Sequence, residues 1–355
     1  MRALDSIAGL KEYDKSGMLE IIESFPDQCQ DAKRIGYEFE LPEGLKKRYR
    51  NIVCVGMGGS AIGADLIRSY ILDDIDVPFF VNRNYLLPNF ADDQTLVIVS
   101  SYSGNTEESL SAYRDAKSRS CEIIAITSGG KLSKMAKDDG VAIIDIPAGL
   151  PPRAALGYSF FPLLILLSKI GIINDQAIFI DNVAQVLRKL RRSRLDYKIK
   201  GKNNQAKKIA VEIYGKLPVV YGSQSHIDSV VTRWRGQLAE NSKTLASSHL
   251  FPEMSHNEIV GWEYPKTVLK NSIVIMLKDA ADHPGILKRM DAVKKLLGKD
   301  GIGVIEVNST GKGLLARMFS LVYIADYVSF YLSILNKTDP LPVERITFLK
   351  KELSR

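Results

Sequence analysis

Short apolar runs alternate with segments of helical periodicity along the first half of the chain. The runs that we predict as strands are Ile52–Val55, Pro78–Val81, Thr95–Ser100, Glu122–Thr127 and Val141–Ile146. Helices are predicted between them at Ala61–Ile71, at Glu107–Lys117 and after Gly130. Because short strands that alternate with helices form parallel sheets covered on both faces, we expect a doubly wound α/β domain.

The same alternation restarts after a polar, charged stretch. In the second half we predict strands at Leu217–Tyr221, Asn271–Leu277 and Gly303–Val307, and helices at Asp228–Asn241 and Leu314–Leu335. A chain of 355 residues is long enough for two such domains. The expected organisation is a helical N-terminal segment over 1–50, α/β domains over 51–174 and 209–335, a helical connection over 175–208, and a C-terminal segment over 336–355.

Composition and charge argue against several classes of protein. Hydrophobic residues make up 45% and charged residues 25% of the chain, as in ordinary globular proteins. The most apolar run, Phe160–Leu167, is too short to cross a bilayer, and the first residues form no apolar signal core.

The net charge is +7, and the chain has a basic run at Arg188–Arg194. No aromatic residues interleave with this run, which favours a solvated helix face over a nucleic-acid site. Cys29, Cys54 and Cys121 match no zinc or redox spacing, which favours reduced thiols and a cytoplasmic protein.

A glycine-rich loop follows the first predicted strand. It reads Gly-Met-Gly-Gly-Ser-Ala-Ile-Gly over Gly56–Gly63 and leads into a predicted helix. Glycine lets backbone N–H groups approach an anion closely, and the N-terminus of a helix adds partial positive charge. Gly58, Gly59 and Ser60 are therefore candidates for phosphate binding. Taken alone, the loop also fits a dinucleotide site or tight packing of a strand on a helix.

A hydroxyl-rich turn follows the third predicted strand. Ser101, Ser103 and Thr106 lie close together just before a helix, where hydroxyls and backbone donors can surround a phosphate dianion. Thr106 alone also fits a simple helix cap. Both loops lie at the carboxyl ends of neighbouring strands, where parallel sheets bind ligands. We expect one phosphate site there and none in the second half, where Lys278–His283 carries two acids and no cluster of hydroxyls.

These loops resemble a known family. The turn Ser101-Tyr-Ser-Gly-Asn-Thr is close to the characteristic loop of SIS (sugar isomerase) domains. The glycine-rich loop looks like that of the bifunctional phosphoglucose/phosphomannose isomerases, known chiefly from archaea. Three later blocks strengthen the resemblance, which runs from about residue 50 to the C-terminus: Pro152–Tyr158, Gln237–Lys243 and Phe251–Trp262.

The resemblance implies two tandem SIS domains and an aldose–ketose isomerase of carbohydrate metabolism, in glycolysis and gluconeogenesis. Glucose 6-phosphate and mannose 6-phosphate would each interconvert with fructose 6-phosphate through a cis-enediol(ate), without a metal or any other cofactor. It also implies a cytoplasmic homodimer whose active site is shared between subunits, with no nucleic acid or membrane as partner.

Glu240 is the candidate base of that reaction. Aldose–ketose isomerisation needs a base that moves a proton between C1 and C2, and positive charge near the developing oxyanion. Glu240 lies near the end of a predicted helix, on the same face as Arg233, Gly236 and Gln237, which is not a normal core stripe. By itself this position also fits a surface glutamate. The resemblance implies the catalytic role, because the family's base falls in this block.

Three further side chains complete the candidate site. Arg153 stands just before an apolar helix, where its charge is unfavourable unless it meets a partner or ligand. The resemblance implies that Arg153 stabilises the enediolate. It also implies that His256, which Glu258 could orient, opens the sugar ring and reaches the neighbouring subunit's site. A lysine near the C-terminus, Lys350 or else Lys351, is expected at the site on the same grounds.

The substrate and the reaction type remain open from the sequence. Leu341 stands where the family leads us to expect a small hydroxyl residue that helps to discriminate the C2 epimers, so the mannose 6-phosphate activity is in question. A nucleotide-dependent dehydrogenase would want an acid after the second strand, where this chain has Asn82 and Arg83. A non-catalytic sugar-phosphate sensor and an isomerase that acts on pentose phosphates are two further functions that the same loops could serve.

Overall fold

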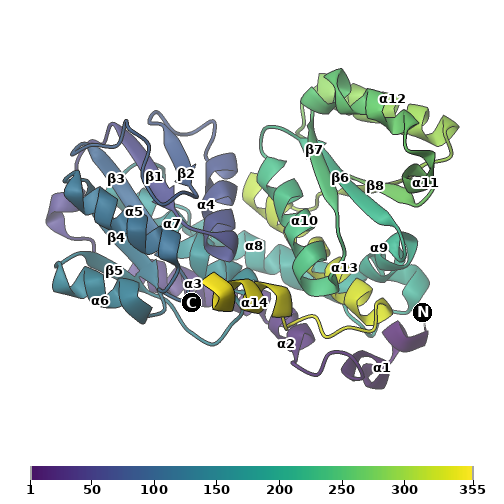
Figure 1. Cartoon of the computed structure of the whole chain (residues 1–355), viewed down its shortest axis with the longest axis horizontal. Helices are drawn as coiled ribbons and strands as arrows, with labels where there is room; N and C mark the ends of the chain where they lie inside the picture. Colours follow the sequence, from purple (N-terminus) through teal and green to yellow (C-terminus); the bar gives the residue numbers. More distant parts are fainter. Residues whose placement is uncertain (1, 354–355) are drawn as a thin grey trace. The chain divides into compact units, whose positions relative to one another are not determined.

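The computed structural model describes residues 2–353, and the chain forms two compact units (Figure 1). The first unit comprises Phe25–Gln185. The second unit comprises the described residues of Met1–Ser24 and Val186–Arg355. Ser354 and Arg355, which belong to the predicted C-terminal segment, lie outside the described residues, as does Met1. The domain boundaries drawn from the sequence stay a prediction.

The N-terminal segment contains several short helices. It contains a 3-10 turn at Arg2–Asp5 and the helices α1 (Ile7–Lys11), α2 (Met18–Glu23) and α3 (Phe25–Glu38). Asp14 accepts hydrogen bonds from the backbone N–H groups of Met18 (2.7 Å) and Leu19 (3.0 Å), so its carboxylate caps the start of α2.

The first unit is built on a parallel five-stranded sheet. Its strands are β1 (Asn51–Val55), β2 (Phe79–Asn82), β3 (Thr95–Ser101), β4 (Glu122–Thr127) and β5 (Ala142–Asp145). Their order is β2-β1-β3-β4-β5. The helices are α4 (Gly58–Tyr70), α5 (Glu107–Ser118), α6 (Gly130–Asp138) and α7 (Leu156–Ile170). All five strands lie where the apolar runs predicted them.

Helices cover both faces of this sheet. Successive strand residues point to opposite faces, so a strand with helices on both sides is apolar at every position. One set of alternate residues packs against α5 and α6 in a single cluster that includes Val53, Val55, Val97, Val99, Tyr113 and Leu132. The intervening residues, such as Ile52 and Ile98, are equally buried. They face the side on which α3, α4 and α7 pack (Figure 1).

The second unit repeats the design with four parallel strands. They are β6 (Leu217–Ser223), β7 (Ser247–Phe251), β8 (Ser272–Lys278) and β9 (Gly303–Asn308), in the order β7-β6-β8-β9. Its helices are α9 (Gln205–Ile213), α10 (Asp228–Ser242), α11 (Lys266–Leu269), α12 (Pro284–Lys299), α13 (Leu314–Leu335) and α14 (Glu344–Leu353). The sequence did not predict β7, α11, α12 or α14. The predicted helical connection contains α8 (Ala177–Leu190), which runs from the first unit into the second.

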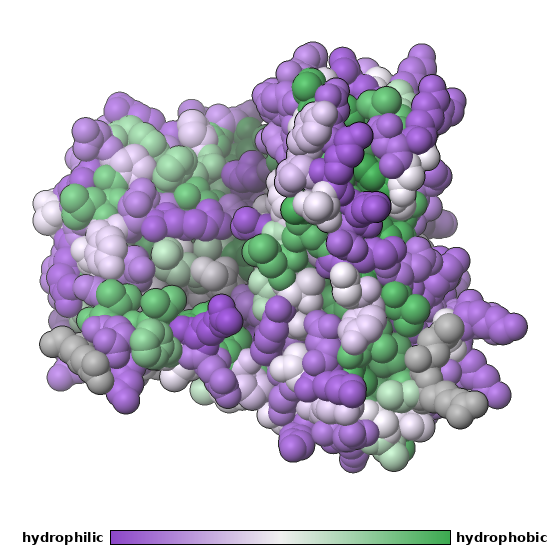
Figure 2. Space-filling model, turned by 45° about the vertical axis from the view of Figure 1, so that its right-hand side comes forward, coloured by the Kyte–Doolittle hydropathy of each residue, from purple (hydrophilic) through white to green (hydrophobic). Residues whose placement is uncertain are grey.

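The longest helix, α13, is mostly apolar and is buried on nearly every side. It is long enough, and with a mean hydropathy of 1.6 apolar enough, to cross a membrane. However, 94% of its most apolar stretch is buried, which is typical of a core helix. It packs against α9 and α10. Hydrophilic side chains cover most of the molecular face in Figure 2, and apolar side chains lie among them in small groups.

Candidate active site

The two predicted phosphate loops lie side by side in the first unit. β1 pairs with β3 from Asn51 opposite Thr95 to Val55 opposite Val99, so both strands end at the same edge. From β1 the chain passes to β2 on one side of the sheet and returns to β3 on the other. The loops after β1 and β3 therefore flank the switch point of the sheet, which is the usual ligand position in this architecture.

The loop after β1 leads directly into the N-terminus of α4, which begins at Gly58, three residues earlier than predicted. The cap position is Met57, and within the described chain no side chain caps this end. A Cβ on Gly59 would lie 2.5 Å from the carbonyl oxygen of Pro152, so only glycine allows this approach. Ser60 is buried, and its Oγ accepts a hydrogen bond from the backbone N–H of Tyr102 (3.1 Å). Ser60 thus joins the two loops, and the first helical N–H groups face the switch point.

The loop after β3 supplies three hydroxyl groups. Ser101 Oγ donates to Thr106 Oγ1 (3.2 Å), and Ser103 Oγ accepts from the backbone N–H of Asn105 (3.3 Å). Thr106 occupies the cap position of α5, but its side chain makes no capping hydrogen bond to any described residue. The interpretation in which Thr106 only caps the helix is therefore wrong. Its hydroxyl bonds within the hydroxyl cluster instead.

The conformation of this loop depends on Gly104. Its backbone has a φ of +65°, and its N–H donates to Ser101 O (3.0 Å) while its carbonyl accepts from Leu132 N (2.9 Å). A Cβ at this position would lie 1.8 Å from the carbonyl oxygen of Gly129. The hydroxyl-rich loop therefore packs directly on the loop that precedes α6.

Arg153 lies beside the glycine-rich loop. It belongs to a 3-10 turn at Pro152–Ala154, and it is only 3% exposed. The backbone of Pro152 and Arg153 contacts Gly59 at the start of α4. The structure thus brings Gly58, Gly59, Ser60, Ser101, Ser103, Thr106 and Arg153 together in the first unit. Two helix N-termini and three hydroxyls make this edge of the sheet suited to an anion, and the backbone of the buried Arg153 packs against it.

Glu240 lies in the last turn of α10, in the second unit, and is half-buried. Its predicted neighbours on the helix face have another function. Asp326 of α13 accepts hydrogen bonds from Arg233 Nη2 (3.0 Å) and Gln237 Nε2 (2.5 Å). The sequence indicated only that this face is not a normal core stripe, and the structure shows that Arg233 and Gln237 are buried on it and join α10 to α13.

His256 lies in a short 3-10 segment, Glu253–His256, after β7. Its imidazole is exposed and makes no hydrogen bond to any residue among 2–353. Glu258 does not orient it here. Glu258 Oε1 accepts instead from the hydroxyl of Tyr221, which in turn accepts from Trp262 Nε1 (2.8 Å). Burial and the Glu258 carboxylate both raise the pKa of Tyr221, so its hydroxyl stays protonated and holds the segment that carries His256.

Lys350 lies on α14, in the last turn of the described chain together with Lys351. The described residues of α14 include no buried side chain. Leu341, in the segment before α14, is half-buried, and its N–H donates to Asp339 Oδ1 (3.0 Å).

The second unit has a switch point of its own, between β6 and β8. There Asp282 accepts hydrogen bonds from Ser223 Oγ (2.6 Å) and from the backbone N–H of Asp279 (3.0 Å). Burial raises the pKa of this carboxyl group, and the two hydrogen bonds oppose that effect. The chain's own carboxylate thus takes donors that a bound anion would otherwise use.

The three cysteines lie inside the described part of the chain. Cys29, Cys54 and Cys121 are buried and form no disulfide among the described residues. Burial raises the pKa of Cys121 to about 11 and also raises the pKa of Cys54, so both remain thiols at neutral pH. Residues 2–353 contain no group of three or more His, Cys, Asp or Glu placed to hold a metal ion.

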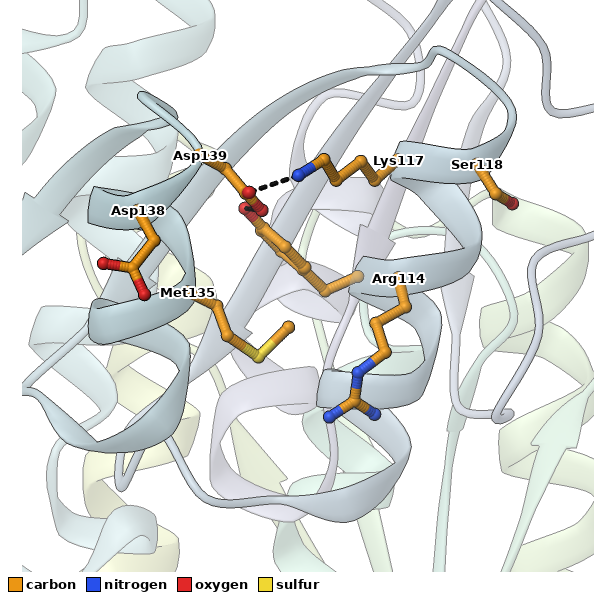
Figure 3. A pocket seen from close by; sticks show the side chains of 7 residues that line it. Arg114, Lys117, Ser118, Met135, Asp138 and Asp139 are labelled. Atoms are coloured by element: carbon orange, nitrogen blue, oxygen red, sulfur yellow. Dashed lines mark hydrogen bonds and ion pairs between the residues drawn. The ribbon is translucent and has the colours of Figure 1, made fainter.

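A separate pocket of about 570 Å³ lies between α5 and α6 (Figure 3). Its side chains, which include Arg114, Lys117 and Met135, come from the later turns of these helices. Those turns lie at the edge of the sheet opposite the phosphate loops, because the helices run antiparallel to the strands. Asp139 already binds Lys117 and Tyr113 there. The pocket is therefore separate from the candidate site.

Comparison with known proteins agrees with this arrangement. Residues 46–158 match the SIS domain, and residues 202–353 match the bacterial phospho-glucose isomerase C-terminal SIS domain, which confirms the predicted pair of SIS folds. A bifunctional phosphoglucose/phosphomannose isomerase from Caldicellulosiruptor bescii is 46% identical over 95% of this chain and 99% of its own. Another such isomerase, from Thermoplasma acidophilum, is 37% identical over 86% of this chain and 90% of its own. The solved C-terminal domain of glucosamine-fructose-6-phosphate aminotransferase from Francisella tularensis has a TM-score of 0.69 at 16% identity, over 92% of this chain and 98% of that one, which shows the fold alone.

Proposed function

The chain belongs to the family of bifunctional phosphoglucose/phosphomannose isomerases, and from this premise we propose that it interconverts glucose 6-phosphate and mannose 6-phosphate with fructose 6-phosphate. The observation that carries the proposal is the pair of glycine-rich and hydroxyl-rich loops at one switch point, in a chain that matches such an isomerase over 95% of its length.

The loops of the first unit would bind the 6-phosphate. Ser101, Ser103 and Thr106 offer hydroxyl groups, and the start of α4 at Gly58 and Gly59 offers backbone N–H groups. The phosphate keeps its charge and geometry throughout the reaction. These contacts therefore hold the substrate equally in the ground and transition states, which lowers KM more than it raises kcat.

Glu240 would move the proton. In the aldose-to-ketose direction its carboxylate takes the proton from C2, and the C1 carbonyl oxygen gains the negative charge of the enediolate. A proton then passes from the C2 hydroxyl to O1, and returning the first proton from Glu240 to C1 gives the C2 ketone of fructose 6-phosphate. Arg153, as a buried cation beside the phosphate loops, would stabilise the oxyanion, while His256 would open the sugar ring. Lys350 would lie near the reacting oxygens.

A single base can serve both aldoses. Glucose 6-phosphate and mannose 6-phosphate differ only at C2, and that carbon becomes planar in the enediol. The product then depends on which face of C2 receives the proton. Leu341, in place of the expected hydroxyl residue, would weaken discrimination or the mannose activity without changing the base.

Replacing Glu240 by glutamine tests the proposed base. The variant keeps the size and hydrogen bonding of the side chain but cannot accept the proton. We expect kcat to fall by roughly 10²–10⁴ for both aldose phosphates in parallel, with KM nearly unchanged. Exchange of the C2 proton with solvent deuterium should be lost. Near-normal exchange would show that another group, such as Glu258 or Glu253, is the base.

His256 would act in the site of a second copy of the chain, so that the homodimer is the catalytic unit. Its exposed imidazole supports this proposal, since the side chain makes no hydrogen bond within the described residues. Mixing inactive Glu240→Gln and His256→Ala chains should restore partial activity in mixed dimers. Failure of recovery after verified subunit exchange would mean that each chain holds a complete site. The three buried cysteines, which form no disulfide among the described residues, support a cytoplasmic location.

A further inference from the structure

The helix that carries Glu240 ends in an unusual conformation. Lys243 follows α10 with a φ of 54°, in the left-handed region that glycine or asparagine normally occupies at this position. The N–H of Thr244 donates to Leu238 O (3.1 Å) and closes the helix end. A side chain with a Cβ is disfavoured there, so a lysine at this position calls for a reason in its side chain.

The ammonium group of Lys243 supplies that reason. Lys243 Nζ donates to Glu240 O (2.8 Å) and also contacts Asn241 O (3.4 Å), the carbonyl oxygens left open in the last turn of α10. It donates further to Pro340 O (3.0 Å). One ammonium thus joins the Glu240 end of α10 to the segment before α14. A cation at the C-terminal end of a helix is also favoured by the helix dipole.

Other contacts hold the same segment in place. Asn336 Nδ2 donates to Ser242 O (2.8 Å) at the end of α10. Asp339 accepts from the N–H of Leu341 (3.0 Å) and from Ser16 Oγ (2.7 Å). The segment is therefore ordered, and Lys243 is the side chain that ties it to the backbone of Glu240 itself.

We propose that Lys243 is a positioning residue that sets the carboxylate of Glu240 against the segment containing Leu341, and thereby sets the ratio of the two aldose products. The inference rests on the proposed function, because it assumes that Glu240 is the base for both aldoses. A displacement of either partner by about 1 Å is enough to change a rate by up to 10²-fold. Leu341 lies on the segment and not on α10 with Glu240. A change in the position of the segment relative to Glu240 would therefore not affect the two faces of C2 equally.

The chain offers a matched control for the test. Lys337 follows α13 in the same conformation, with a φ of 55°. Its side chain is exposed and makes no hydrogen bond or ion pair to the described residues. Replacing each lysine by glycine relieves the same backbone strain, but only Lys243→Gly removes the carbonyl contacts.

Both variants and the wild type are assayed on fructose 6-phosphate, with both aldose products followed and folding checked by circular dichroism. We expect Lys243→Gly to lower kcat by roughly 10–100-fold, with KM changed less than threefold and the product ratio shifted by more than threefold. Lys337→Gly should match the wild type in all three. Lys243→Arg, which keeps the positive charge, should recover most of the rate and the original ratio.

An unchanged product ratio in Lys243→Gly would overturn the inference, because a purely structural lysine scales both rates together. If Lys243→Gly does not fold, the same comparison is made with Lys243→Met, which keeps the length of the side chain without the charge. Failure of the wild type to isomerise fructose 6-phosphate would refute the proposed function itself, and so is distinguishable from failure of this inference.

Discussion

Replacing Gly104 by alanine should damage phosphate binding through one steric contact. The added Cβ would lie 1.8 Å from Gly129 O, whereas real Cβ atoms essentially never come closer than 3.0 Å to such an atom. The two loops must therefore separate by about 1.2 Å. Gly104 stands between Ser103 and Asn105, so this movement displaces the hydroxyl groups proposed to hold the phosphate.

The expected size of the effect follows from that displacement. Misplacing a binding group by about 1 Å can cost up to 10²-fold. We expect the KM for fructose 6-phosphate to rise by roughly 30–100-fold, with kcat within threefold of the wild type, since the phosphate is held alike in both states. Left-handed backbone adds a cost of roughly 1–2 kcal/mol in stability for alanine. That cost alone lowers the Tm by about 2–4 °C per kcal/mol in a domain of this size.

Gly140→Ala is the control that separates strain from collision. Gly140 has nearly the same φ, +67°, and a Cβ there would meet no described atom within 4 Å. It follows α6 at the opposite edge of the sheet from the phosphate loops. This variant should lose similar stability and keep a normal KM. The assay couples aldose formation to a dehydrogenase over a range of substrate concentrations. A Gly104→Ala enzyme with wild-type KM, or a Gly140→Ala enzyme with a raised KM, would refute the reasoning.

Three further substitutions test other contacts. Ser103→Ala should raise KM more than it lowers kcat, and equal binding of non-phosphorylated fructose by the wild type would contradict the phosphate assignment. Tyr221→Phe leaves the indole N–H of Trp262 without its acceptor, which should cost about 1–3 kcal/mol in a denaturant titration and lower kcat by loosening the His256 segment. Asp326→Ala removes the α13 carboxylate that accepts from Arg233 and Gln237 of α10, and should cost about 3–5 kcal/mol; a Tm within 2 °C of the wild type would show that this buried pair contributes little.

Buried strands were predictable from sequence because both of their faces are covered. β1, β3 and β4 are buried at nearly every position, have continuous apolar runs and lie where predicted. β7 was missed because it is an edge strand of mixed composition, Ser-Ser-His-Leu-Phe, and only its last residue is buried. The start of α4 was placed three residues late, because Gly58 and Gly59 are poor helix formers whose position is set by the loop they serve.

The phosphate loops were predictable because their chemistry is local in sequence. The partners of individual side chains were not. Asp326, which binds Arg233 and Gln237, is 93 and 89 positions away from them in the chain, so helical periodicity could not distinguish a ligand-facing surface from a packing surface. Lys243 carried a weak signal, as a lysine directly after a helix. Its three carbonyl contacts, one of them to Pro340, appear only in the folded chain.

The central claim is that one metal-independent site forms both aldose phosphates through a shared enediol. The most direct measurement follows the purified chain with fructose 6-phosphate and EDTA in deuterium oxide by NMR. We expect both glucose 6-phosphate and mannose 6-phosphate to appear, each carrying deuterium at C2. Formation of neither product, protium at C2 in either product, or activity that returns only when zinc is added would contradict the account.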